Sequence, residues 1–250
     1  MTPIRSAEPW QLFELTTRTN DSTFYLRPSA VVNSRVLGCI ARAQTIYPVR
    51  VHAFVVMSNH YHLLVSAPDA RQLSRFMCHL NGNVARKINR LLGRSGRFWH
   101  RPFRSIPVSS EPAAQKGRLK YILSHGVKER LVKRARDWPG ASSLPWMLEG
   151  RALTGLWQDQ TEEYKLNRGK PLEEHVDVLV EYELKMSPLP CWEGEPESAW
   201  RSWARELVTE LEAEWDAERG SAPVLGAEAV RRVDPFSRPR FTSWKKAPHC

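Results

Sequence analysis

The sequence has few cysteines and no long hydrophobic run, and both absences narrow the possible classes of protein. Its four cysteines, at positions 39, 78, 191 and 250, form no Cys-x-x-Cys pair, which argues against a disulfide framework and against a zinc ribbon. No run approaches the length of a transmembrane helix, and the N-terminus lacks the apolar region of a signal peptide. We therefore expect a cytoplasmic protein without a membrane partner. Its 250 residues suffice for a core that needs no covalent or metal staple.

Acidic residues are scarce in one part of the chain. The net charge is +10, but residues 71–140 carry 17 basic and only 3 acidic side chains, a local charge of +14. Residues 141–220 carry 8 basic and 18 acidic side chains, so the sign reverses there. A basic block of this size is typical of proteins that bind nucleic-acid phosphates. The acidic block indicates a separate element that does not lie on the same polyanion.

The order of the expected elements predicts the fold. It comprises a strand at 11–19, a helix at 28–47, a hairpin at 51–65, a helix at 68–92, a strand at 103–109 and a helix at 111–132. This is the order of a ferredoxin-like α+β fold, a four-stranded antiparallel sheet with helices on one face. Asp69 is the expected N-cap of the second helix.

The chain after residue 148 differs in composition. We expect a mostly helical, acidic extension at 149–220, with an amphipathic helix at 198–218. Residues 221–250 are rich in proline and arginine and predict a loose basic tail. The predicted domain is therefore residues 1–148.

The hairpin carries the first candidate site. Two apolar runs flank Ser58-Asn59, and the second strand opens with His60-Tyr61-His62. Because side chains alternate between the two faces of a strand, His60 and His62 point the same way and Tyr61 points the other. Two imidazoles on one face form half of a metal site. The alternative is a pair of polar residues on the solvent face of the sheet.

Four segments in sequence resemble a known family. They are Val51 to Val65, Phe98 to Ser105, Tyr121 to Val132 and Asp137 to Ser143. In these segments the chain resembles the single-tyrosine HUH transposases, most closely the REP-associated tyrosine transposases of bacteria. The resemblance implies a ferredoxin-like domain that binds a divalent metal ion and cleaves single-stranded or hairpin DNA. It also implies a nucleoid-associated protein of the bacterial cytoplasm, either a monomer or a homodimer.

The resemblance assigns roles to individual residues. His60 and His62 would be metal ligands, and Tyr121 would be the nucleophile that leaves a 5′-phosphotyrosine link and a free 3′-OH. His125 follows Tyr121 by four residues on the same expected helix, so it is a candidate third ligand. Taken alone, Tyr121 is equally compatible with a place at the edge of the core, and His125 with an interaction with the helix dipole.

The chain departs from the family pattern at two places. The family usually has Asn-Pro where this chain has His125-Gly126, and Ser58 replaces a common proline. The expected cofactor is Mg²⁺ or Mn²⁺. A third imidazole favours Mn²⁺, because nitrogen ligands prefer the later first-row metals.

The basic block supplies candidate DNA contacts. Basic side chains bind phosphates, and aromatic ones among them stack on unpaired bases. The candidates are Arg86, Lys87, Arg90, Arg94, Arg97, Phe98, Trp99, Arg101, Arg104 and Lys120. The sequence thus predicts a metal-dependent DNA strand transferase. Two alternatives stay open: a non-catalytic binder of structured DNA or RNA derived from a transposase, and a nuclease that hydrolyses DNA through water.

Overall fold

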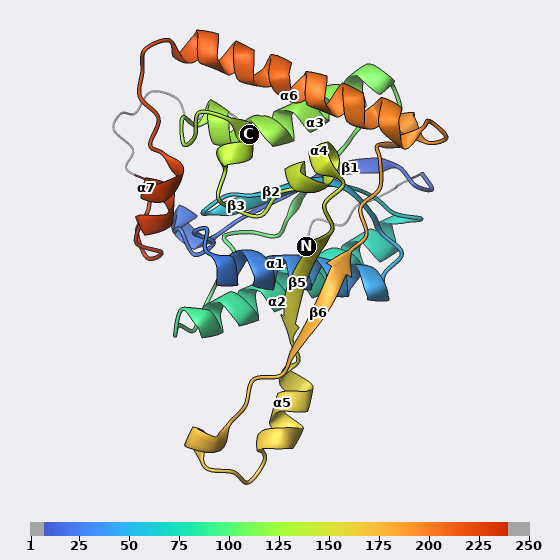
Figure 1. Cartoon of the computed structure of the whole chain (residues 1–250). Helices are drawn as coiled ribbons and strands as arrows, with labels where there is room; N and C mark the ends of the chain where they lie inside the picture. Colours follow the sequence, from blue (N-terminus) through green and yellow to red (C-terminus); the bar gives the residue numbers. More distant parts are fainter. Residues whose placement is uncertain (1–7, 240–250) are drawn as a thin grey trace.

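A computed structural model describes residues 8–239 of the chain. A four-stranded antiparallel sheet lies between two layers of helices (Figure 1). Its order is β2-β3-β1-β4, built from β1 (Leu12–Arg18), β2 (Arg50–Val56), β3 (His60–Ser66) and β4 (Arg104–Pro107). With α1 (Ala30–Ile46) between β1 and β2 and α2 (Ala70–Leu91) between β3 and β4, the predicted ferredoxin-like α+β fold is confirmed.

One face of the sheet packs on α1 and α2 through apolar side chains. Leu15, Phe54 and Leu63 point to this face from three strands and are fully buried, together with Phe76 of α2. Burying a side chain of this kind stabilises the fold by about 1.5–3 kcal/mol. Asp69 caps α2 as predicted, because its carboxylate accepts a hydrogen bond of 2.7 Å from the backbone of Gln72. This face is a core.

The opposite face is covered by other helices. They are α3 (Pro112–Lys128), α4 (Leu144–Glu149) and α6 (Glu197–Arg219), with α6 lying across α3 in Figure 1. Leu64 of β3, Ile122 of α3 and Leu207 of α6 belong to one buried cluster. The expected arrangement of helices on one face therefore describes α1 and α2, while α3 lies on the other face. The inward side chains of α3 consequently meet those of β3.

The acidic extension contains a second antiparallel pair that the sequence did not predict. It consists of β5 (Leu153–Gln158) and β6 (Leu179–Leu184), packed against α1. A Cβ atom at Gly155 would lie 2.2 Å from the backbone nitrogen of Gly38, so helix and strand backbones touch. The expected amphipathic helix at 198–218 is present as α6. Only part of the extension is therefore helical.

The extension shares its packing with the predicted domain. Leu153 and Leu184 lie in the same buried cluster as α1 and α2, and α6 lies in the same cluster as α3. The division into a family domain ending at residue 148 and an extension stays a prediction. Both buried clusters contain residues from either side of residue 148.

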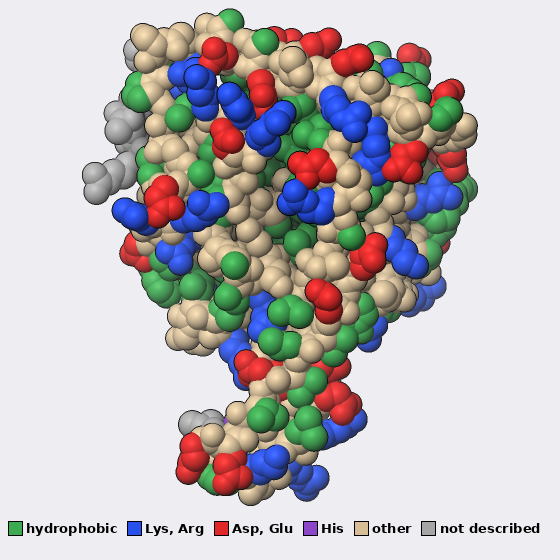
Figure 2. Space-filling view, viewed as in Figure 1, with side chains coloured by type: hydrophobic (Ala, Val, Ile, Leu, Met, Phe, Trp, Pro, Cys, Tyr) green, Lys and Arg blue, Asp and Glu red, His purple; other side chains and the backbone are tan. Residues whose placement is uncertain are grey.

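Two short helices, α5 and α7, follow β5 and α6 along the chain. Between β5 and β6, α5 (Gln160–Asn167) and the loop to residue 178 project from the body and carry side chains of both charges (Figure 2). Near the C-terminus, α7 (Ala227–Arg232) follows a stretch bonded to the end of α3, where Leu225 donates to the carbonyl of Arg130. Short 3₁₀ turns occur at Asn20–Ser22, Ala135–Asp137, Leu172–Glu174 and Pro190–Trp192.

The predicted basic tail at 221–250 is partly folded. Residues 221–239 contain α7, and residues 240–250 lie outside the described part. Within residues 8–239, none of the helices has both the length and the apolar character needed to cross a membrane.

Candidate metal centre and active site

Three histidine side chains meet between the sheet and α3. His60 and His62 project from β3, and His125 projects from α3. Their candidate ligand nitrogens all lie within 4.8 Å of one another. The ring centroids of His62 and His125 are 4.1 Å apart, and those of His60 and His62 are 5.2 Å apart. This histidine cluster could hold a divalent metal ion.

Hydrogen bonds orient the two histidines of β3. Nδ1 of His60 lies 2.6 Å from Oδ1 of Asn59, and Nδ1 of His62 lies 2.7 Å from Oε1 of Glu14. Both oxygens are acceptors, so each Nδ1 carries the proton and donates it. The lone pair of each ring is therefore on Nε2.

His125 is held in the same manner. Its Nδ1 lies 3.1 Å from the carbonyl oxygen of Ile122, one turn earlier on α3. All three rings thus donate from Nδ1 to separate acceptors and keep Nε2 for a ligand. A hydrogen bond at the second nitrogen is the usual support of a metal-binding histidine, so this donor set fits a metal ion.

Burial keeps two of the histidines neutral. It lowers the pKa of His60 well below the ordinary value of 6.5, and nearby His62 and His125 act in the same direction. Burial also lowers the pKa of His125 to about 3, again with His62 adding to the effect. A neutral imidazole retains the lone pair that a metal ion requires.

Tyr121 lies beside the cluster, one helical turn before His125. Its ring centroid is 4.8 Å from that of His125 and 5.9 Å from that of His62. Two cations approach the ring: Lys128 Nζ is 4.9 Å and Arg118 Cζ is 5.7 Å from the centroid. The structure therefore brings together the four residues predicted as nucleophile and ligands. Tyr61 points to the other face, as alternation along β3 requires.

Glu14 and Arg118 belong to the site but were not identified from the sequence. Glu14 lies on β1 and is buried, and its Oε2 is 2.8 Å from Nη1 of Arg118 on α3. Burial raises the pKa of Glu14, but the hydrogen bond from His62 and the positive charges around it bring the pKa below the ordinary value of 4.5. An acidic residue inside an apolar, alternating strand is rarely buried without a partner, and this signal was present in the sequence.

The predicted DNA contacts on α2 lie on the wrong side of the sheet. Helix α2 packs against the face opposite the histidine cluster, so Arg86, Lys87 and Arg90 are remote from it. Lys87 is 1% exposed, and its Nζ donates to the carbonyl of Gln158 at 2.6 Å and lies 3.8 Å from the centre of the Trp157 ring. Lys87 is therefore bound to the extension, and the prediction that it contacts DNA is wrong.

Arg90 has acidic partners. It pairs with Glu163 and Asp177 at 2.6 and 2.9 Å. Arg86 is exposed and bonds Asn83 on its own helix at 2.8 Å. Neither arginine has a geometry that directs it to the histidine cluster. Acidic residues of the extension thus neutralise part of the positive charge of α2.

The loop after α2 uses most of its predicted residues for packing. Phe98 is buried in the core under α2, so the prediction that it stacks on a base is wrong. Trp99 donates from Nε1 to the carbonyl of Asn81 and packs on Tyr61. The guanidinium of Arg94 lies 4.1 Å from the ring centre of Tyr25.

Other basic residues do face the histidine cluster. Arg104 on β4 pairs in register with Thr16 of β1, whose other partner is His62, so Arg104 points to the same face as His62. Arg18 of β1 pairs in register with His60 and is exposed. These positions place two exposed arginines on the side of the sheet that carries the site.

The remaining predicted residues lie around this edge. Arg97 and Arg101 are exposed in the loop that runs beside the end of β1, where the backbone of His100 donates to the carbonyl of Arg18. Lys120 lies on α3 and pairs with Glu214 of α6 at 2.5 Å. Arg97, Arg101 and Arg104 are therefore the predicted contacts best placed for a DNA strand near the site.

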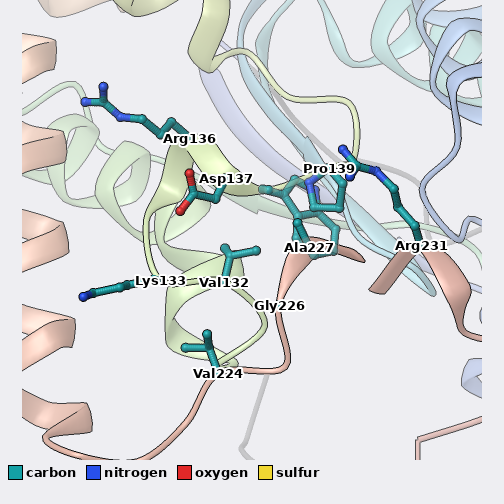
Figure 3. A pocket seen from close by; sticks show the side chains of 10 residues that line it. Val132, Lys133, Arg136, Asp137, Pro139, Val224, Gly226, Ala227 and Arg231 are labelled. Carbon is teal, nitrogen blue, oxygen red and sulfur yellow. The ribbon is translucent and has the colours of Figure 1, made fainter. Parts of the chain in front are cut away.

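A separate pocket lies at the C-terminal end of α3. It has a volume of about 460 Å³ and is lined by residues from the segments 132–139 and 224–231 (Figure 3). Trp138, whose Nε1 donates to the carbonyl of Val56 at 3.0 Å, forms part of its wall. Arg231 points toward Pro139 across the pocket in Figure 3. The histidine cluster is not part of this lining.

Part of this chain is similar to known transposases. The sequence profile described as "Transposase IS200 like" matches residues 15–125. Among solved structures, one of a REP-associated tyrosine transposase bound to a REP hairpin is similar, with 18% identity, a TM-score of 0.47, and coverage of 57% of this chain and 82% of that chain. A putative transposase from Deinococcus radiodurans R1 has 20% identity, a TM-score of 0.35, and coverage of 47% and 94%. No curated protein matches.

The profile match includes the main parts of the site. It begins within β1 and ends at His125, so it contains His60, His62 and Tyr121. The resemblance to transposases inferred from the sequence is thereby confirmed. Over residues 15–125, this chain is similar to the family described as IS200-like transposases.

Proposed function

We propose that this protein is a single-tyrosine DNA endonuclease and strand transferase that depends on a divalent metal ion and acts on single-stranded or hairpin DNA. The observation that carries the proposal is the packing of Tyr121 against His125 and His62, at 4.8 and 5.9 Å between ring centroids. A nucleophile and a ligand set from different elements converge on one point. The match of residues 15–125 to a transposase family supports a role in DNA processing.

The proposed reaction begins with attack of the Tyr121 phenol oxygen on phosphorus. The bond from phosphorus to the 3′ oxygen breaks, the phenol loses its proton to solvent, and the 3′ oxygen takes one up. The products are a 5′-phosphotyrosine and a free 3′-OH, so the phosphoester bond is retained for a later rejoining step. A divalent metal ion held by His60, His62 and His125 would supply charge neutralisation and alignment of the phosphate.

The three ligands favour a particular metal. Each histidine offers a ring nitrogen, whereas Mg²⁺ prefers oxygen ligands. We therefore propose Mn²⁺ as the better cofactor. His125 is the reason for this preference, because it replaces the asparagine that the family usually has at this position and offers nitrogen in place of oxygen.

We propose that DNA crosses the face of the sheet near the ends of β1 and β4. The exposed side chains of Arg18 and Arg104 share this face with the histidines, and Arg97 and Arg101 lie in the adjoining loop. Contacts of this kind bind phosphates and give affinity without reading sequence. We also propose that the protein associates with the bacterial nucleoid and acts as a monomer or homodimer.

The two alternative functions would give different experimental results from the proposed one. A non-catalytic binder of structured DNA or RNA would not need three oriented imidazoles beside a tyrosine, and a hydrolytic nuclease would not need the tyrosine. Incubating the protein with a labelled library of single-stranded hairpins and Mn²⁺, followed by denaturing gels, separates the three. The proposal expects labelled DNA that stays attached to the protein. Cleavage without attachment indicates hydrolysis, and retention on native gels without cleavage indicates a binder.

A further inference from the structure

Glu14 connects two residues of the site that come from different elements. It lies on β1 and is 2% exposed. Its Oε1 accepts the hydrogen bond from Nδ1 of His62 on β3, at 2.7 Å, and its Oε2 faces Nη1 of Arg118 on α3, at 2.8 Å. Each carboxylate oxygen therefore serves a different partner, and both partners belong to the site.

Packing alone does not explain an acidic residue at this position. Burying a carboxylate is costly unless charged and hydrogen-bonded partners compensate for the lost water. The neighbouring positions on the strand that face the same way are Leu12, which is buried, and Thr16. An aliphatic residue would fill the space without that cost. The carboxylate is thus explained by what it holds in place.

Arg118 has the geometry of a phosphate-binding side chain. It precedes Tyr121 by three residues on α3, and its guanidinium carbon is 5.7 Å from the centre of the Tyr121 ring. About a third of the side chain is exposed, with a relative accessibility of 34%. A guanidinium has five N–H donors in a fixed plane, so pairing one edge with Glu14 leaves others for a second anion.

We propose that Glu14 is a positioning residue that holds His62 as a metal ligand and Arg118 as a group that binds the scissile phosphodiester. This inference rests on the proposed function and adds two residues to it. One buried carboxylate then sets the spacing between a ligand on the sheet and a phosphate-binding cation on the helix of the nucleophile. Lys128 also approaches the Tyr121 ring, at 4.9 Å, but no ion pair with Glu14 is seen for it in the described chain.

The test compares Glu14→Gln, Arg118→Ala and the double variant, with Glu149→Gln as the matched control. Glu149 pairs with Arg151 at 2.6 Å on the exposed surface, so its loss removes a carboxylate–arginine pair elsewhere. Glutamine can still accept from His62, but its amide NH₂ would face the donors of Arg118. Two measurements are made: binding of Co²⁺ alone, followed by its visible absorption, and the rate of adduct formation with hairpin DNA at saturating Mn²⁺.

The two residues are expected to affect different measurements. Glu14→Gln should weaken Co²⁺ binding on the order of 10-fold to 100-fold, because a neutral amide oxygen holds the Nδ1–H of His62 less strongly than a carboxylate does, and should alter the Co²⁺ spectrum. Arg118→Ala should bind Co²⁺ like the wild type and form adduct on the order of 100-fold more slowly. The double variant should form adduct no more slowly than Arg118→Ala, because Glu14 acts on the phosphate through Arg118.

Three results would overturn the inference. Co²⁺ binding by Glu14→Gln equal to that of Glu149→Gln removes Glu14 as a positioning residue. Wild-type adduct rates in Arg118→Ala remove Arg118 from phosphate binding, and additive losses in the double variant break the link between them.

If Glu14→Gln does not fold, Glu14→Asp takes its place. A carboxylate one methylene shorter cannot span both partners, so the same directions of change are expected. If the wild type forms no adduct while Glu14→Gln still loses Co²⁺, the proposed function fails and the role of Glu14 toward His62 stands.

Discussion

The rings of Tyr121 and His125 lie 4.8 Å apart on successive turns of α3, with their planes at 79° to each other. His125 donates from Nδ1 to the helix backbone, so its Nε2 is directed to the cluster with His60 and His62. The residue that follows Tyr121 by four positions is therefore a nitrogen donor in this chain.

Substitution of His125 should change both metal affinity and metal preference. We expect His125→Ala to weaken metal binding and cleavage together. His125→Asn should retain activity but shift the preference from Mn²⁺ toward Mg²⁺, because an amide oxygen is a harder ligand than imidazole nitrogen. Cleavage titrated with each metal measures this, with the exposed His100→Ala as control. A wild-type titration for His125→Ala would show that His125 is not a ligand.

The salt dependence of DNA binding should depend on the arginines that face the site. Each neutralised phosphate contributes about −0.7 to the slope of log K against log salt for single strands. Replacing Arg18 and Arg104 with alanine should flatten this slope by about 1–1.5 in total. Replacing the exposed Arg75 and Arg86 of α2 should leave it unchanged. Equal slopes for the two double variants would contradict the proposed path of the DNA.

Acid should destabilise the protein partly through His52. This side chain is buried, with Nδ1 2.6 Å from the carbonyl of Pro188 and Nε2 2.9 Å from Oγ of Ser66. Burial lowers its pKa from 6.5 to about 4, so the unfolded chain takes up a proton first as the pH falls. The stability that His52 contributes is complete above pH 6.5 and decreases by about 1.4 kcal/mol per pH unit below it, down to about pH 4.

Urea unfolding of the wild type and of His52→Gln at several pH values measures this contribution. The free energy by which the wild type exceeds the variant should shrink between pH 6.5 and 4. The exposed His175→Gln serves as the control and should track the wild type. A gap between wild type and His52→Gln that does not vary with pH would show that His52 titrates normally in the folded protein.

Two glycines should respond to alanine in opposite directions. At Gly155 a Cβ would lie 2.2 Å from the nitrogen of Gly38 and 2.6 Å from the carbonyl oxygen of Ser34, and these backbone atoms cannot move aside. We expect Gly155→Ala to destabilise the fold by about 1–3 kcal/mol or more. Gly117 in α3 has open space around its Cα, so Gly117→Ala should stabilise by about 0.5–1 kcal/mol. Thermal unfolding of both variants measures the two effects, and equal melting temperatures would contradict the close packing of β5 on α1.

This packing also revises what removal of the extension should do. From the composition alone, a chain ending near Gly150 is expected to keep its chemistry. In the structure such a chain would lose β5 from α1, the carbonyl partner of Lys87, and α6 from the outer side of α3. Loss of activity in that truncation would therefore reflect lost packing. Removal of residues 160–178 alone is the smaller change, because they project from the body (Figure 2) and the ion pairs that it removes are those of Glu163 and Asp177 with Arg90.

Features set by short-range periodicity could be predicted from the sequence. Alternation along β3 put His60 and His62 on one face, and helical spacing put Tyr121 and His125 on one side of α3. The order of apolar segments specified the sheet and the first two helices. These inferences needed only residues two to four positions apart.

Features that depend on distant residues could not be predicted. The strands β5 and β6 pair across twenty intervening residues, so no short turn between them indicates the pairing. The charge of α2 did not reveal which side of the sheet the helix covers. Arg90 finds its acidic partners at Glu163 and Asp177, far along the chain. The partners of Glu14 depend on the register of β1 with β3 and on the position of α3.

The attachment site of DNA on the protein tests the central claim most directly. Wild type and Tyr121→Phe are incubated with labelled hairpin DNA and Mn²⁺, digested with protease, and the nucleotide-linked peptide is identified by mass spectrometry. The account predicts a wild-type peptide linked through Tyr121, and a variant that binds the hairpin but forms no adduct, since phenylalanine keeps the ring and loses only the oxygen. An adduct in Tyr121→Phe, or a wild-type link through Tyr61 or another tyrosine, would contradict it.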